Sequence, residues 1–298
     1  MNRETDIPLL LISKCSFQIN AFRFPRIGDR GIHMDARNIA QLQSRAAKAN
    51  VELFDSEFHW CQAAIELMID THAFLGSKEI AAGSREEQYQ RDPVRHDVMN
   101  TIINLSYDAG GSLISALRLV ECGLIADAWS LIRVAFETTS YSEFFAFNPS
   151  KLRDYSSVES LLVKGRIEGV KGKPLDVASE FAKRSIGVSD VRKALSEDDD
   201  FSRRDFYSRL SSLGTHASPL RPGLRIGIGE PEVRMYLSIG RRELRQCVAD
   251  LAAVIKYALG IPFEHCVEFL RSSEKLTERY ETLLVEYFGI YPPPVVPN

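Results

Sequence analysis

The sequence predicts an all-α fold, a helical bundle built on a central αα-hairpin. Apolar residues recur at spacings of three and four along most of the chain, which is the period of a helix with one buried face. No alternation of apolar and polar residues continues for more than about four positions, so no strand is expected. With 45% hydrophobic and 26% charged residues among 298, the composition is that of an ordinary soluble protein.

The N-terminal region changes character at Met34. Residues 1–33 have no clear period and contain scattered proline and glycine, which predicts an irregular arm. Either translation starts at Met34, or the arm wraps a partner. From Met34 to about Leu75 the pattern predicts a long helix, and from Phe54 onward its apolar residues step 4-3-4-3-4-3. Such a heptad seam is typical of an antiparallel bundle helix or a dimer interface.

The central hairpin is predicted between Asp92 and Phe147. Asp92 is a good N-cap, and Pro93 suits the first helical position because its missing N–H would be unpaired there anyway. An apolar stripe then continues until Gly123, and a second stripe ends before Pro149. The connection is only about two residues long, so the two helices must be antiparallel neighbours.

Past Pro149 the helical pattern is less regular. An irregular helical insertion is expected over about residues 150–200, followed by a helix over Phe201–Gly214 and a loop rich in glycine and proline over 217–232. Two more helices follow, the first stopped by Gly260 and Pro262. Residues 34–290 are thus expected to form a single helical domain, and residues 291–298 a proline-rich tail.

Composition also excludes several kinds of function. The formal charge of -3 gives no global attraction for nucleic acid, so such a claim needs a local patch. Five scattered cysteines without a CxxC spacing indicate buried thiols in a reducing cytoplasm. The six histidines have no metal-ligand spacing, and neither a metal nor a cofactor is expected. We also expect no membrane segment, because no window of eighteen apolar residues occurs.

One face of the second hairpin helix carries a line of polar residues. Its members recur at steps of three or four: Asp127, Ser130, Arg133, Glu137 and Tyr141. They are either a solvated surface with an ordinary i,i+4 pair between Arg133 and Glu137, or a buried ion pair. Apolar neighbours such as Trp129 and Phe136 add weight to the second interpretation.

The segment Phe201–Arg245 is rich in arginine. It contains nine arginines, four acids and no lysine, which gives a local charge of +5 on a chain of -3. Arginine is preferred where planar, bidentate donation to phosphate or carboxylate matters. Arg221 and Arg225 are therefore candidate ligand-binding residues, although several of these arginines could instead pair with acids inside the protein.

The hairpin and this segment together resemble the HEPN superfamily of helical bundles and its uncharacterised prokaryotic relatives. The resemblance rests on an Arg-x-x-x-Glu element, Arg133 to Glu137, and on a later Tyr-x-x-Leu-Ser…His element, Tyr207 to His216. It covers residues 97–258. It implies binding residues Arg133, Glu137 and Tyr207, and a homodimer whose sites form between two chains.

The resemblance leaves three functions open. The first is binding of RNA, a nucleotide or a phosphate ligand, with a role in prokaryotic defence or stress response. The second is a metal-independent endoribonuclease, in which Arg209 would hold the scissile phosphate and His216 would act as general acid or base. In this chain Leu210 stands where the ribonuclease motif prefers a polar residue, and Gly214 interrupts the helix before His216. The third is a non-catalytic dimeric scaffold in which these residues form a buried polar network.

Overall fold

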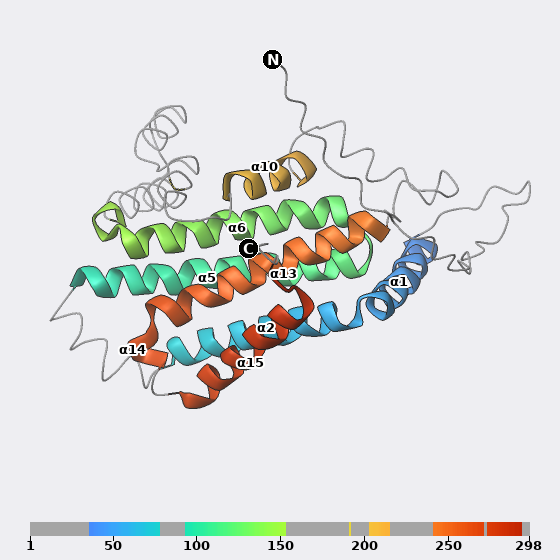
Figure 1. Cartoon of the computed structure of the whole chain (residues 1–298). Helices are drawn as coiled ribbons and strands as arrows, with labels where there is room; N and C mark the ends of the chain where they lie inside the picture. Colours follow the sequence, from blue (N-terminus) through green and yellow to red (C-terminus); the bar gives the residue numbers. More distant parts are fainter. Residues whose placement is uncertain are drawn as a thin grey trace, which may run out of the picture. The chain divides into compact units, whose positions relative to one another are not determined.

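The computed structural model describes residues 36–77, 93–152, 191, 203–214, 241–270 and 273–293. Every regular element within these ranges is a helix, which confirms the predicted all-α fold (Figure 1). The chain divides after Ile39, and the bundle belongs to the unit that begins at Ala40. In order, the helices are α1 (Ala36–Leu53), α2 (Asp55–Leu75), α5 (Pro93–Glu121), α6 (Ile125–Phe147), α10 (Arg203–Gly214), α13 (Arg241–His265), α14 (Val267–Leu270) and α15 (Glu274–Ile290).

The predicted hairpin is confirmed as α5 and α6, which pack along one another (Figure 1). Gly123 ends α5 with a φ of 76°, in the left-handed region that glycine enters without steric cost. The Gly123 N–H donates to the Val120 carbonyl at 2.9 Å, and the Leu124 N–H donates to the Leu119 carbonyl at 2.8 Å. This is a Schellman motif, which satisfies the last carbonyls of α5 while the chain reverses.

Helix α13 makes the most varied contacts in the bundle, since it packs against α2, α5 and α6, while α10 covers α6 and α15 covers α2. Leu251 and Ile255 on α13 are fully buried. By length and composition the Arg242–His265 stretch of α13 could cross a membrane, but 72% of its most apolar window is buried inside the protein. Its apolar character therefore has an explanation in the bundle core.

The predicted long N-terminal helix is interrupted at Phe54, where α1 ends and α2 begins. The apolar stripe of the first half ends at Leu53 and that of the second half starts at Phe54. Leu53 is 43% exposed while Phe54 is buried, so only the second stripe faces the core; adjacent residues point about 100° apart on a helix. Phe54 leaves helical geometry, with φ −129° and ψ 43°, and is itself buried.

The prediction that Gly260 and Pro262 stop a helix is wrong, because α13 continues through both residues to His265. An internal proline costs a helix about 3 kcal/mol. Leu259, Ile261 and Phe263 around it are all buried, and each such side chain contributes about 1.5–3 kcal/mol. Burial thus outweighs the proline penalty. The last predicted helix is divided into α14 and α15.

Several predicted segments lie outside the described residues. They are the arm over 1–33, nearly all of the insertion over 150–200, and the loop over 217–232. The same holds for the tail beyond residue 293.

Candidate functional site

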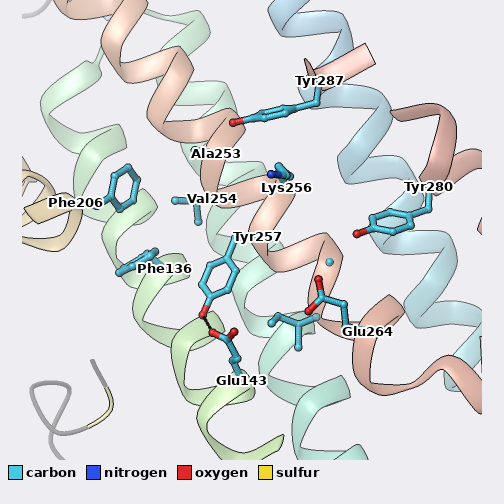
Figure 2. A pocket seen from close by; sticks show the side chains of 12 residues that line it. Phe136, Glu143, Phe206, Ala253, Val254, Lys256, Tyr257, Glu264, Tyr280 and Tyr287 are labelled. Carbon is cyan, nitrogen blue, oxygen red and sulfur yellow. Dashed lines mark hydrogen bonds between the residues drawn. The ribbon is translucent and has the colours of Figure 1, made fainter. Parts of the chain in front are cut away.

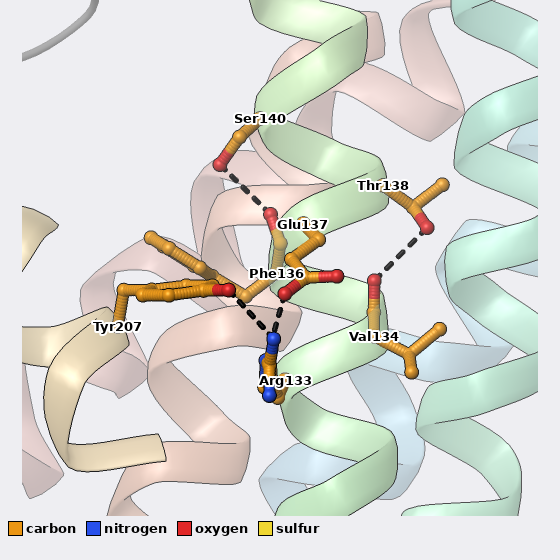
Figure 3. Close-up of polar contacts among 7 residues, drawn as sticks. All are labelled: Arg133, Val134, Phe136, Glu137, Thr138, Ser140 and Tyr207. Carbon is orange, nitrogen blue, oxygen red and sulfur yellow. Dashed lines mark hydrogen bonds and ion pairs between the residues drawn. The ribbon is translucent and has the colours of Figure 1, made fainter. Parts of the chain in front are cut away.

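The Arg-x-x-x-Glu element of α6 forms the ion pair that its spacing predicts. Arg133 Nε donates to Glu137 Oε1 at 2.7 Å, and Arg133 Nη2 donates to the Tyr207 hydroxyl at 2.6 Å (Figure 3). The guanidinium also lies 4.9 Å from the centre of the Tyr207 ring. The side chains of Arg133 and Glu137 are 17% and 22% exposed, so the pair is intermediate between the solvated and the buried interpretation.

The surroundings of Arg133 keep it firmly protonated. Burial lowers its pKa, but the hydrogen bond and negative charge of Glu137 outweigh this effect, and the pKa lies above its ordinary value. Arg133 is thus a fixed positive charge held by groups on two helices.

Tyr207 reaches α6 because its neighbour Phe206 anchors α10. Phe206 and Leu210 are buried one helical turn apart, and the Phe206 ring lies 5.1 Å from the Phe136 ring on α6. This apolar contact lays α10 along α6. The next residue, Tyr207, then lies beside Arg133, so Tyr207 meets the Arg-x-x-x-Glu element of α6 in space.

A second polar centre surrounds Asp250 of α13. Its carboxylate accepts hydrogen bonds from Arg209 Nη2 at 2.5 Å, from Gln246 Nε2 at 2.9 Å and from the buried Trp129 Nε1 at 3.0 Å. Asp250 is only 2% exposed. Burial raises its pKa, while the positive charge of Arg209 acts in the opposite direction. The Asp250 centre therefore ties α6, α10 and α13 together.

Arg209 belongs to this centre, but it is not enclosed. It bonds to Asp250 through Nη2, and its guanidinium lies 5.0 Å from the centre of the Phe206 ring. Its side chain nevertheless remains 44% exposed. The predicted catalytic arginine thus has a structural partner on one side and solvent on the other.

Asp250 was not among the predicted site residues. The sequence does carry a signal for it: a lone acid within the apolar stripe formed by Cys247, Val248, Leu251 and Ala252. A carboxylate at a core position is costly unless it is paired. The partner, Arg209, is 41 positions earlier in the chain. The pattern therefore predicts a buried acid but does not indicate which residue pairs with it.

The other predicted site residues, His216, Arg221 and Arg225, lie outside the described residues. Arg242 and Arg245, at the start of α13, are exposed. The guanidinium of Arg245 lies 5.9 Å from the centre of the Phe54 ring. The positively charged segment therefore continues onto the exposed start of α13.

Three cysteines, Cys61, Cys247 and Cys266, are buried small side chains, as predicted, whereas Cys122 is only half-buried. Burial raises the pKa of Cys266 to about 12 and that of Cys61 further still. A thiol that stays protonated at neutral pH is a poor nucleophile. These three residues therefore belong to the packing of the core.

The fold defines the chain as an all-α helical-bundle protein with two arginine–carboxylate pairs, Arg133–Glu137 within α6 and Arg209–Asp250 between α10 and α13. Comparison with models of protein families, with curated proteins and with solved structures finds no match.

Proposed function

We propose that the protein binds RNA, or a nucleotide or other phosphate ligand, through the arginine-rich segment Phe201–Arg245. Arg209, Arg133 and Tyr207 form the described part of this site, and Arg221, Arg225 and His216 complete it. The context that fits such a HEPN-like binder is prokaryotic defence or stress response, in the cytoplasm and as a homodimer.

The exposure of Arg209 is the observation that carries this proposal. A salt bridge to buried Asp250 fixes the position of the guanidinium, while 44% of the side chain remains exposed. An oriented arginine loses less conformational freedom when it binds a phosphate than a mobile one does. Arg133 and Glu137 form a second ion pair, on α6, and this pair is neutral overall. The net positive charge of the site must therefore come from the other arginines of the segment.

The binding test uses a fluorescently labelled RNA pool and measures anisotropy over a range of salt concentrations. Wild-type affinity should fall by a factor of about 10³ or more between about 50 and 200 mM salt, because each neutralised phosphate releases counterions. Replacing both Arg221 and Arg225 by alanine should reduce the salt slope by about two. Arg118→Ala is the matched control, since Arg118 is an exposed α5 arginine outside the segment, and its affinity should equal that of the wild type.

The same RNA, examined on a denaturing gel, tests for the ribonuclease function. If Arg209 and His216 are catalytic, the wild type shortens the RNA, and His216→Ala retains binding but loses cleavage. If the wild type binds the RNA but does not cleave it, the ribonuclease function is excluded and the binding function remains.

The second candidate function, a non-catalytic dimeric scaffold, is favoured by the hydrogen-bond network around the buried Asp250. That carboxylate is fully engaged by donors from three helices, as expected for a group that fixes packing. If the wild type neither retards nor cleaves RNA, and Arg209→Ala melts well below it, the scaffold function replaces the binding proposal.

A further inference from the structure

A pocket of about 500 Å³ lies along α13, with α6 and α10 on one side and α15 on the other (Figure 2). Its volume is in the range typical of small-molecule sites. Arg133, Glu137, Tyr207 and Arg209 do not line it, although Phe206, whose ring lies against the Arg209 guanidinium, does. The lining residues are Phe136, Glu143, Phe206, Ala253, Val254, Lys256, Tyr257, Gly260, Ile261, Glu264, Tyr280 and Tyr287.

Five aromatic rings give the pocket its apolar surface. On the α6 side, the Phe136 ring centre lies 5.1 Å from that of Phe206 and 5.8 Å from that of Tyr257. These contacts hold the three rings as one rigid wall. Such a wall suits the flat or aliphatic body of a small ligand.

On the α15 side a cation already lies against ring faces. The Lys256 ammonium is 5.0 Å from the centre of the Tyr287 ring and 4.7 Å from that of Phe288. The negative face of an aromatic ring attracts cations. This wall of the pocket is therefore compatible with positive charge.

The formal charge of the lining residues is negative, with two glutamates and one lysine. Glu143 is 8% exposed and accepts a short hydrogen bond from the Tyr257 hydroxyl (Figure 2). Its carboxylate is thus engaged with the pocket wall. Glu264, by contrast, is exposed on α13, and its carboxylate can receive a donor from a ligand.

Two oxygen atoms, the Tyr280 hydroxyl and Glu264 Oε1, lie close to Gly260, where the absence of a side chain leaves space. A β-carbon at this position would lie 3.4 Å from the Tyr280 hydroxyl and 3.5 Å from Glu264 Oε1. Tyr280 is held in place by stacking on Phe263, with ring centres 4.1 Å apart and planes 7° from parallel. Burial and the charge of Glu264 raise the Tyr280 pKa to about 12, so its hydroxyl is neutral and offers an acceptor lone pair.

We propose that this pocket binds a small organic cation, an ammonium group carried on an apolar or aromatic body. Glu264 and the Tyr280 hydroxyl hold the ammonium above Gly260. Phe136, Phe206 and Tyr257 pack against the body. An anionic ligand of the same shape is disfavoured, because it would face two carboxylates and a lysine that is already placed over rings.

Isothermal titration calorimetry with three probes of similar shape tests which sign of ligand charge the pocket prefers. The probes are phenethylammonium, the neutral 2-phenylethanol and the anionic 3-phenylpropionate, each titrated into the full-length protein. Phenethylammonium should bind at least about fivefold more tightly than the alcohol, because it gains one partly exposed ion pair. The anionic 3-phenylpropionate should bind most weakly. Equal affinity for the ammonium and the alcohol, or no heat with any probe at about 1 mM, would overturn the proposal.

Three variants test the assigned residues. Glu264→Gln should weaken phenethylammonium binding about fivefold, and Lys256→Gln should strengthen it, since a competing positive charge is removed. Glu281→Gln, on the exposed surface of α15, is the matched control and should bind like the wild type. Unchanged affinity in Glu264→Gln, with an unchanged melting curve, would refute the assigned ammonium site.

Discussion

Replacing Arg209 by alanine tests whether the Asp250 centre stabilises the bundle. Asp250 is 2% exposed, and Arg209 is its cationic partner at 2.5 Å. The variant leaves this buried carboxylate with only the neutral donors Trp129 and Gln246. A buried charge without a counter-charge is unfavourable, because neutral donors replace only part of the lost interaction.

The size of the effect follows from the burial of the two partners. Removing one member of a fully buried ion pair costs about 3–5 kcal/mol. Arg209 is 44% exposed, so water already screens part of its charge, and the expected loss of unfolding free energy is about 2–3 kcal/mol. The loss of the Arg209 contact with the Phe206 ring adds no more than about 0.5–1 kcal/mol.

The pH dependence of this loss has a definite sign. Burial raises the pKa of Asp250, so the folded protein holds this proton more tightly than the unfolded chain does. The contribution of Asp250 to stability therefore falls as pH rises from its ordinary value through its folded value. Without Arg209 the folded pKa rises further. The deficit of Arg209→Ala should thus be larger at about pH 7 than at about pH 5.

Urea denaturation, followed by circular dichroism, measures these free energies. Arg118→Ala is the control, since Arg118 is 75% exposed and should contribute less than about 0.5 kcal/mol. Adding Asp250→Asn to Arg209→Ala should recover part of the loss, because the unpaired charge is then gone. A loss below about 0.5 kcal/mol in Arg209→Ala, or no recovery in the double variant, would refute this account of the centre.

Three further predictions concern other parts of the bundle. His72, whose ring meets that of Tyr107 edge-on and whose Nε2 is buried without a partner among the described residues, has its pKa lowered by burial. The contribution of the neutral His72 side chain to stability is therefore complete above about pH 6.5 and is lost as pH falls. His72→Leu should be stabilising in chemical denaturation, and more so at about pH 5.5 than at about pH 8. An equal effect at both pH values would contradict this prediction. Gly123→Ala should lower the free energy of unfolding by about 1–2 kcal/mol in a urea titration, because φ is positive at Gly123. In the same experiment Gly111→Ala should be neutral or stabilising by up to about 1 kcal/mol, since nothing lies within 4 Å of its added β-carbon. Sedimentation at micromolar concentration should give a dimer, and a monomer unaffected by dilution or by RNA would count against the shared site.

The sequence by itself determined the features that depend on neighbouring residues. The hairpin follows from the helical period between Pro93 and Phe147, and its turn follows from Gly123, because glycine alone adopts the required backbone conformation readily. The ion pair between Arg133 and Glu137 follows in the same way from i,i+4 spacing on one helix.

The tertiary structure alone decided the features that depend on distant partners. Helix α13 passes through Pro262 because burial against other helices outweighs a local penalty. The N-terminal helix breaks at Phe54, which the core buries while the preceding Leu53 remains exposed. Arg209 meets Asp250 across 41 positions, and the pocket near Gly260 collects rings from four helices. The free energy of such contacts depends on which surfaces meet when the helices pack, and the period of a single helix contains no information about that choice.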